Sequence, residues 1–287
     1  MTGVLIHWFR NDLRLHDHPA LAQSMARCRR DGLALLPVAW HGPSAPVATR
    51  WGFDRVGPHR RAFRAQALAG LAQALRARGS ELIVIEGTSA QPLAELARRI
   101  GAVGLVGAAI DAPEEQAEVA ALQAQGLTVH TVEQGGLFDA SQLPWAPGSV
   151  PNVFTAFRQG VERIGLLPAT PLPAPATLPP WPEALPRLPA LALDAALPAG
   201  SADERSSFPC GLPGWHGDEA SALNHLRAYL ASERPHTYKA TRNALTGRDF
   251  ASHWSPWLAV GALSARQVVA DLRAMEAERG ASHGSYW

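Results

Sequence analysis

The chain has 287 residues, which corresponds to about two domains of average size, and 47% of its residues are apolar while 18% are charged. This composition supports a sizeable core and excludes a chain that is disordered over most of its length. Arginine and lysine number 26 and aspartate and glutamate number 25, a net charge of +1, which gives no support to a polybasic nucleic-acid-binding surface or an acidic tail.

Two cysteines, Cys28 and Cys210, cannot by themselves form a disulfide framework or a four-ligand zinc site. No apolar run reaches the ~18 residues needed to span a bilayer, and the first residues lack the basic start and long apolar stretch of a signal peptide. We therefore expect a soluble, cytoplasmic protein with no membrane segment and no bound metal.

Short aliphatic runs alternate with longer amphipathic stretches over the first 135 residues. The segments 61–78 and 92–100 have helical spacing, and Pro19 just after Asp17 indicates a helix start behind an N-cap. The alternation predicts an α/β doubly wound parallel sheet with helices on both faces, whose ligand crevice lies at the carboxyl ends of the strands. The runs that we predict as buried strands are 4–8, 33–40, 81–85, 103–106 and 127–132.

Residues 168–198 contain ten of the 24 prolines, which indicates an extended interdomain connector because proline prevents regular helix and sheet. Beyond it, residues 217–232 and 264–279 have helical spacing, and Asp218 is placed to cap the first of these helices. We therefore divide the chain into an α/β domain over 1–165, a Pro-rich connector over 166–200 and an all-helical region over 201–287.

Most catalytic signatures are absent. The glycines between 101 and 107 follow the pattern GxxGxxG across a predicted strand, which is not the dinucleotide-binding fingerprint. There is no phosphate-binding GxxxxGK[ST] loop, no HExxH and no GxSxG. His16 and His18 flank Asp17 and could be taken for metal ligands, but a polar turn that caps a helix is the favoured interpretation.

Residues 7–17, HWFRNDLRLHD, lie where the first predicted strand ends and its crevice-facing loop begins. Arg10 and Arg14, with Asp12 between them, could hold the anionic groups of a ligand. The alternative, which we prefer from the residues alone, is an ion-pair network that fixes the loop.

Residues 238–264 combine hydroxyls, three cations and aromatic side chains before a Ser-Pro turn into a helix. A hydroxyl-rich loop at a helix start suits phosphate binding, and Arg242, four residues after Tyr238, suits a phosphate contact through its planar guanidinium. An exposed loop packed by Trp254 and Trp257 is an equal alternative on composition.

Taken together, these segments resemble a known family. HWFRNDLRLHD resembles the opening of the photolyase/cryptochrome family, and YKATRNALTGRDF over 238–250 with SPWLAVGALS over 255–264 resembles its flavin-binding segment, closest to the DASH cryptochrome branch. NVFTAFR over 152–158 matches the family at the corresponding place. The resemblance implies a Rossmann-like antenna domain, followed by the N-terminal part of an all-α FAD-binding domain.

The resemblance implies FAD as the cofactor and a loop that contacts its phosphates. Three residues depart from the family pattern in this loop, because Ala251 replaces Thr or Ser, His253 replaces Lys or Arg, and Trp254 replaces Leu or Phe. The cofactor-binding residues that the resemblance implies are Tyr238, Ala251, Ser252, His253, Trp254 and Ser255.

The resemblance also implies that Arg242 contacts the DNA backbone. The α/β domain would hold an antenna chromophore, for which a folate, 5,10-methenyltetrahydrofolate, near Glu133 is one candidate. No catalytic residue is assigned.

The implied activity is that of a DNA photolyase, a lyase that repairs cyclobutane pyrimidine dimers by light-driven electron transfer from reduced FAD to a dimer flipped out of DNA. Its partner would be UV-damaged DNA, including single-stranded DNA. A photoreceptor that repairs nothing and a non-catalytic remnant of the family are the alternatives. Family members continue beyond the position of Trp287 into helices that enclose the flavin ring, so we expect the 287-residue chain to bind FAD weakly and to repair no DNA.

Overall fold

The computed structural model describes residues 3–40, 48–85, 87, 89–146, 148–189, 197, 208–244 and 250–280. Residues 190–196 and 198–200 of the connector and residues 245–249 of the flavin-segment motif lie outside the described residues. Within these residues five parallel strands form one sheet, in the order β3-β2-β1-β4-β5. The strands are β1 (Val4–Phe9), β2 (Ala34–Trp40), β3 (Ile83–Ile85), β4 (Ala102–Ala108) and β5 (Val129–Val132).

The predicted parallel, doubly wound sheet is confirmed, because each strand coincides with a predicted run and all neighbours are parallel. Every residue of β1 and β2 is buried, as expected for central strands covered on both faces. Gly107 of β4 pairs with Trp8, and a Cβ at this position would lie 2.9 Å from the Trp8 carbonyl oxygen. This glycine permits close packing of two strands.

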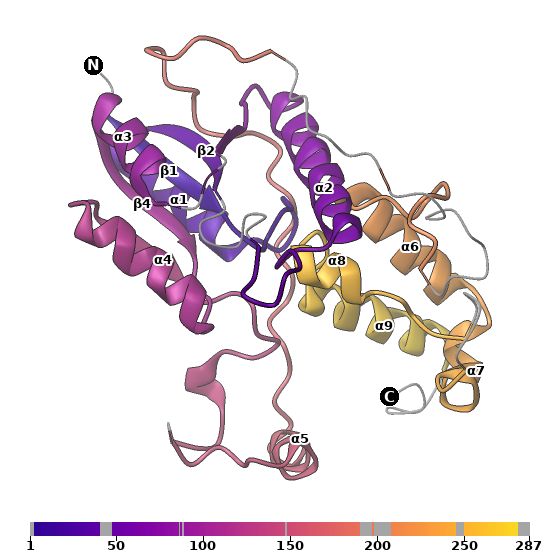
Figure 1. Ribbon diagram of the computed structural model, residues 1–287. Coiled ribbons are helices and arrows are strands. Elements are labelled where there is room, and N and C mark those ends of the chain that lie inside the picture. The colour runs from indigo at the N-terminus through magenta and orange to yellow at the C-terminus, as the bar shows by residue number, and fades with distance from the viewer. Residues whose placement is uncertain are drawn as a thin grey trace.

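Four helices cover the sheet (Figure 1). The helices α1 and α2 pack on one face and α3 and α4 on the other, since their buried side chains belong to two separate hydrophobic clusters. Sequence analysis missed α4, whose only buried residues are Glu118 and Leu122. The bounds are α1 (Pro19–Asp31), α2 (Pro58–Arg76), α3 (Gln91–Arg99) and α4 (Pro113–Ala124).

The start of α1 corrects one expectation. Its N-cap is His18, whose side chain accepts a hydrogen bond from the Leu21 N–H. The expected cap, Asp17, does not act here because its carboxylate bonds Ser264 and Arg266. The polar turn at the start of α1 was therefore predicted, but the residue that caps the helix was not.

A short 3₁₀ turn (Ala140–Gln142) and α5 (Phe154–Arg163) precede the Pro-rich connector, and α5 projects away from the sheet (Figure 1). The described residues 164–189 contain no helix or strand, as the prolines predict. The connector nevertheless contributes to the core, because Trp181 is buried in the cluster under α3. The Pro180 carbonyl accepts a hydrogen bond of 3.0 Å from the Leu35 N–H.

The described residues after 208 form helices and loops, as predicted. The predicted cap is confirmed, because Asp218 accepts from the Ser221 N–H. The structure adds a second cap, Ser264, whose hydroxyl accepts from the Arg266 and Gln267 N–H groups. The helix expected after the Ser-Pro turn is α8, whereas α7 was not predicted. The bounds are α6 (Glu219–Ala231), α7 (Arg234–Thr241), α8 (Ser255–Val260) and α9 (Ala265–Arg279).

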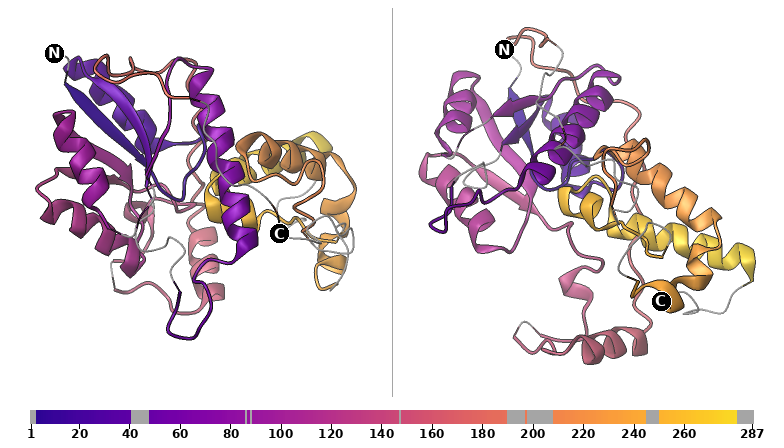
Figure 2. Two further views of the ribbon diagram at one scale, coloured as in Figure 1. Left: turned by 45° about the horizontal axis from the view of Figure 1, so that its top comes forward. Right: turned by 45° about the vertical axis from the view of Figure 1, so that its right-hand side comes forward.

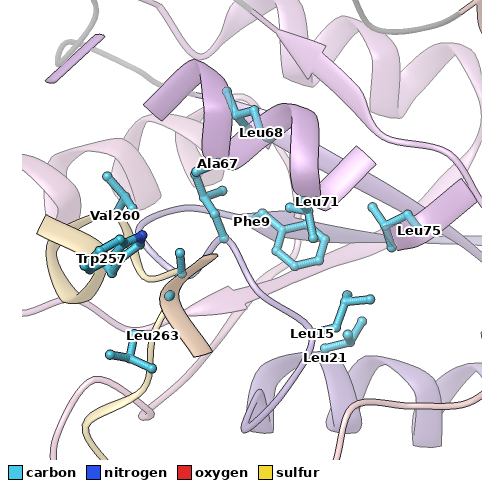
Figure 3. Close-up of a cluster of buried hydrophobic side chains, with 14 of the residues drawn as sticks. Phe9, Leu15, Leu21, Ala67, Leu68, Leu71, Leu75, Trp257, Val260 and Leu263 are labelled. Carbon is cyan, nitrogen blue, oxygen red and sulfur yellow. The ribbon is translucent and has the colours of Figure 1, made fainter. Parts of the chain in front are cut away.

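One hydrophobic cluster joins the sheet to the helical region (Figure 3). Leu71 of α2 lies near Phe9 at the end of β1. Trp257 and Val260 of α8 belong to the same cluster and lie nearer the start of α2. Figure 2 shows α6 and α9 beside α2, on the side away from α3 and α4. The boundaries at residues 165 and 200 remain a prediction, since this core is continuous.

Candidate functional site

The loop over residues 250–255 lies between α7 and α8, and α7 anchors its start. The Thr241 hydroxyl at the end of α7 donates to the Phe250 carbonyl over 2.9 Å. This bond links the two ends of the segment that resembles the family's flavin-binding motif.

α6 holds the middle of this loop through His225. Its Nε2 lies 3.0 Å from the Ser252 carbonyl oxygen, and a carbonyl only accepts, so Nε2 carries the proton. Burial lowers the pKa of His225, against the opposing effect of that hydrogen bond. The ring packs at a tilt between two tryptophans, with its centroid 4.8 Å from Trp257 and 4.7 Å from Trp215, which holds a neutral imidazole beneath the loop.

The next two residues pack against aromatic side chains. His253 has a left-handed backbone, with φ of 56°, and its ring lies 5.9 Å from Trp215 and 5.6 Å from Phe250. The Trp254 ring meets Tyr229 of α6 edge-on at 5.1 Å. These contacts place the main chain of the loop firmly on α6.

The serine hydroxyls of the loop, unlike its main chain, have no partner among the described residues. Ser252 is half-buried and Ser255 is exposed, and neither hydroxyl makes a hydrogen bond within the part of the chain that the structure describes. Ala251 is half-buried and contributes no polar side-chain atom. The loop therefore combines a fixed main chain with hydroxyls that can bond a ligand.

Tyr238 and Arg242 lie one turn apart at the end of α7, on the same side of the helix. Tyr238 is half-buried, while Arg242 is exposed and its N–H donates to the Tyr238 carbonyl over 2.9 Å. Burial raises the pKa of Tyr229, and the neighbouring Tyr238 raises it further. The polar groups of α7 and the following loop are therefore the Tyr238 phenol, the Arg242 guanidinium and the hydroxyls of Ser252 and Ser255.

The loop between β1 and α1 forms a buried ion-pair network, which was the preferred interpretation of its charges. Arg10 bonds the Glu118 carboxylate at 2.7 Å and the Ala108 carbonyl at 3.1 Å. Asp12 accepts from the Arg10 N–H and from Gln134 Nε2, both at 2.6 Å. Burial alone would raise the pKa of Asp12, but the charge and hydrogen bond of nearby His18 hold it below its ordinary value.

The second half of this loop locks onto the turn between α8 and α9. Arg14 donates to the Gly261 carbonyl over 2.9 Å, and Asp17 bonds Ser264 and both donor nitrogens of Arg266. Burial alone would raise the pKa of Asp17, but the hydrogen bonds from Arg266 and Ser264 lower it below its ordinary value. We call this contact between residues 13–17 and residues 260–266 the junction.

His16 also joins the two regions, since its Nδ1 lies 2.6 Å from Glu219 Oε1 at the start of α6. The pKa of Glu219 is held low by the hydrogen bond and charge of His16, against the effect of burial.

Among the described residues, no group of three or more His, Cys, Asp or Glu side chains is placed to hold a metal ion. None of the described helices has the length and hydropathy of a membrane span.

Glu133, named for the folate, is exposed at the end of β5, whereas its neighbour Gln134 is buried. Sequence analysis missed Gln134, Glu219 and His225, each of which bonds a predicted segment more than 25 positions away. A single polar residue on a helix or strand end carries no signal for such a distant partner.

Comparison with known proteins matches residues 5–176 to the DNA photolyase family. The chain is 32% identical over 286 residues to the cryptochrome DASH of Natronomonas pharaonis and 33% identical over 295 residues to that of Gloeobacter violaceus. These alignments cover 98% and 100% of this chain but 58% and 56% of those proteins. The chain thus spans little more than half the length of the relatives it matches.

Solved structures agree with this assignment. The cryptochrome of Synechocystis sp. PCC6803 matches over 100% of this chain and 59% of its own, with a TM-score of 0.87 and 30% identity. A bacterial class III photolyase from Agrobacterium tumefaciens shares the fold, with a TM-score of 0.75 at 24% identity over 100% of this chain and 56% of its own. The chain belongs to the DNA photolyase/cryptochrome family.

Proposed function

We propose that this chain supplies the antenna domain and the phosphate side of the FAD site of a DASH-type, blue-light flavoprotein. The observation that carries the proposal is the 250–255 loop, whose main chain is fixed by His225 and Thr241 while its serine hydroxyls have no partner among the described residues. Hydroxyls at the surface of a rigid loop suit the oxygens of a diphosphate.

In this proposal Ser252, Ser255 and Tyr238 bind and orient the diphosphate and ribose of FAD, and Ala251, His253 and Trp254 shape the loop. Bound FAD supplies a light-driven electron donor. The neutral His225 holds the Ser252 carbonyl in place through a hydrogen bond and brings no charge to the site. A folate antenna near Glu133 remains part of the proposal, as an added light absorber.

A competition experiment tests the phosphate side. FAD fluorescence is titrated with the protein, and ADP and riboflavin are added separately as competitors. If the loop binds the diphosphate, ADP displaces FAD and riboflavin does not, and Ser252→Ala weakens binding about tenfold, the value of one hydrogen bond to a charged group. Ser149→Ala, which removes an exposed hydroxyl elsewhere, is the matched control. Displacement by riboflavin alone would overturn the proposal.

We further propose that the substrate is DNA that carries cyclobutane pyrimidine dimers, including single-stranded DNA, and that Arg242 contacts its backbone. Arg242→Ala should weaken binding to damaged and undamaged DNA alike and reduce the salt dependence by about one phosphate. Arg30→Ala, an exposed arginine of α1, is the control. Loss of lesion discrimination at unchanged overall affinity would contradict this role.

Blue-light illumination of a dimer-containing oligonucleotide with the FAD-loaded protein distinguishes repair from signalling. Repair that follows flavin reduction and light supports the photolyase. Stoichiometric flavin without repair supports the photoreceptor alternative, and a chain that retains no flavin supports the non-catalytic remnant.

A further inference from the structure

The segment before α2 presents two large aromatic side chains to solvent. Trp51 is 65% exposed and Phe53 is 61% exposed, and their rings lie 14° from parallel with centroids 6.2 Å apart. Residues 48–57, drawn in violet in Figure 2, extend away from the sheet in the left-hand view. Aromatic rings exposed in this way forgo a large burial area, which points to a partner that covers them.

The turn that carries these rings has a defined shape. The N–H and the hydroxyl of Thr49 both donate to the Phe53 carbonyl, over 2.8 and 2.7 Å, and the Gly52 N–H donates to the Thr49 carbonyl over 3.1 Å. An antiparallel bridge joins Ala48 to Asp54. Because these bonds set the orientation of the rings in advance, a ligand that stacks on them bears little ordering cost.

The charge of this segment differs from that of the whole protein. Residues 48–64 contain five arginines and one aspartate, a net charge of +4, whereas the entire chain has +1. The guanidinium of Arg50 lies 4.5 Å from the centre of the Trp51 ring, within the range of a cation–π contact. A positive charge therefore lies over one face of the Trp51 ring, next to the exposed Phe53 ring.

Of these five arginines, two fix the base of the turn, Arg64 is half-buried on α2, and two face solvent. Arg55 pairs with Glu114 at the start of α4, and Arg61 pairs with Asp54. In the described part of the chain, Arg50 and Arg60 have no carboxylate partner.

We propose that Trp51, Phe53 and Arg50 form a binding surface for single-stranded nucleic acid. Exposed aromatic rings bordered by cations bind unpaired bases, because every base has a face that stacks while the arginines attract the phosphates. Paired bases in a duplex cannot reach such a surface. A protein partner would also cover the rings, but the excess of arginine over carboxylates favours a polyanion.

This surface lies in the connection between β2 and α2, and no residue of the proposed FAD loop contributes to it. It goes beyond the proposed function, because it needs neither flavin nor light and binds undamaged strands. Its ligand class is therefore single-stranded DNA or RNA of any sequence.

Fluorescence anisotropy with a labelled oligo(dT) of roughly a dozen nucleotides tests the surface. All variants carry Arg242→Ala, so that a contact in the helical region does not contribute. Trp51→Ala with Phe53→Ala should weaken binding at least about tenfold, because each stacked base contributes roughly a five- to hundredfold change in affinity. Trp51→Tyr should retain most of the binding, and Arg50→Ala should also lower the salt slope by about one phosphate.

Phe154→Ala is the matched control, because Phe154 is 73% exposed on α5, outside this surface, and its loss should leave the anisotropy curve unchanged. Thermal melting of each variant verifies that the fold is intact. Unchanged oligo(dT) affinity in the double variant overturns the proposal. Equal affinity for duplex and single strand also overturns it, as does a change confined to self-association, which would assign the rings to a protein contact.

Discussion

Two polar loops of this protein use their side chains in opposite ways. In the β1–α1 loop, the charges of Arg10, Arg14 and Asp17 are buried and bond partners inside the fold. In the 250–255 loop, the main chain of Ser252 is bonded by His225 while its hydroxyl stays unbonded among the described residues. The first loop is therefore a structural contact between two regions, and the second has a serine hydroxyl with no partner among the described residues, as the proposed FAD site requires.

Both loops belong to segments that resemble the family, but burial and hydrogen-bond partners distinguish the residues that stabilise the fold from those available to bind a ligand. Buried charges must have partners, because an unpaired buried charge costs several kcal/mol. Hydroxyls at the surface can lack a protein partner at little cost, since water replaces it. Variants at the junction should therefore change folding stability, and variants in the 250–255 loop should change ligand binding.

The strongest test of the junction is Gly261→Ala. Gly261 has φ of 74°, and a Cβ there would lie 2.0 Å from the Asn11 carbonyl oxygen and 2.3 Å from the Asp12 Cα. Both are backbone atoms of the β1–α1 loop, so the two regions would have to separate. We expect a loss of about 3–5 kcal/mol in the free energy of unfolding, measured by urea denaturation.

Gly280→Ala is the control for this variant. Gly280 has φ of 65° but no atom within 4 Å of the added Cβ, so only the backbone strain of about 1–2 kcal/mol applies. Equal losses in both variants would show that the junction is not closely packed.

The next largest effect is expected for Asp17→Asn. The asparagine keeps the shape and the left-handed backbone of this position (φ 42°), but it removes the carboxylate that pairs with Arg266 and one of the negative charges that face Arg14. We expect a loss of about 3 kcal/mol in unfolding free energy. Glu162→Gln removes an exposed partner of Arg158 and should cost at most about 0.5 kcal/mol. A loss as small at Asp17 would mean that the ion pair contributes little.

The third prediction concerns pH. Burial, with a smaller contribution from the charge of His18, lowers the pKa of His7 to about 3, whereas unfolded histidine has a pKa near 6.5. Between these values the unfolded chain binds a proton that the folded chain does not, so stability is complete above pH ~6.5 and falls as pH decreases.

The expected slope from His7 is up to about 1.4 kcal/mol per pH unit. Denaturation midpoints of wild type and His7→Gln, measured between pH 5 and pH 6.5, check this prediction. Asp17 and Glu219 have lowered pKa values, so their contributions are lost only in more acidic solution, below about pH 4. The glutamine variant should show the shallower slope, and two parallel curves would be inconsistent with a neutral buried His7.

The smallest effect on stability is expected in the 250–255 loop. Ser252→Ala and Ser255→Ala remove hydroxyls that bond nothing in the described residues, so unfolding free energies should stay within about 0.5 kcal/mol of wild type. His225→Phe removes the hold on the Ser252 carbonyl and should cost about 1 kcal/mol. A serine variant less stable than His225→Phe would show that the hydroxyls serve the fold.

The sequence by itself determined the elements whose signals are local. Five strands and their parallel orientation follow from apolar runs that alternate with amphipathic segments, whereas their order in the sheet was not predicted. The cap Asp218 was predicted because a capping side chain bonds an N–H only two or three residues away. The absence of regular structure over the described residues 168–189 follows from proline, which lacks an N–H donor.

Only the tertiary structure decided which charges meet. Asp17 is sequentially placed to cap α1, yet it bonds Arg266, 249 positions away, and His18 caps the helix instead. Trp181 of the connector joins the core beneath α3, and His225 supports a loop 27 positions further on. The Asp17 contact depends on how α8 and α9 pack against α2 and the end of β1, whereas Trp181 packs on the opposite face of the sheet. A pairwise contact between distant residues leaves no periodic pattern in the sequence.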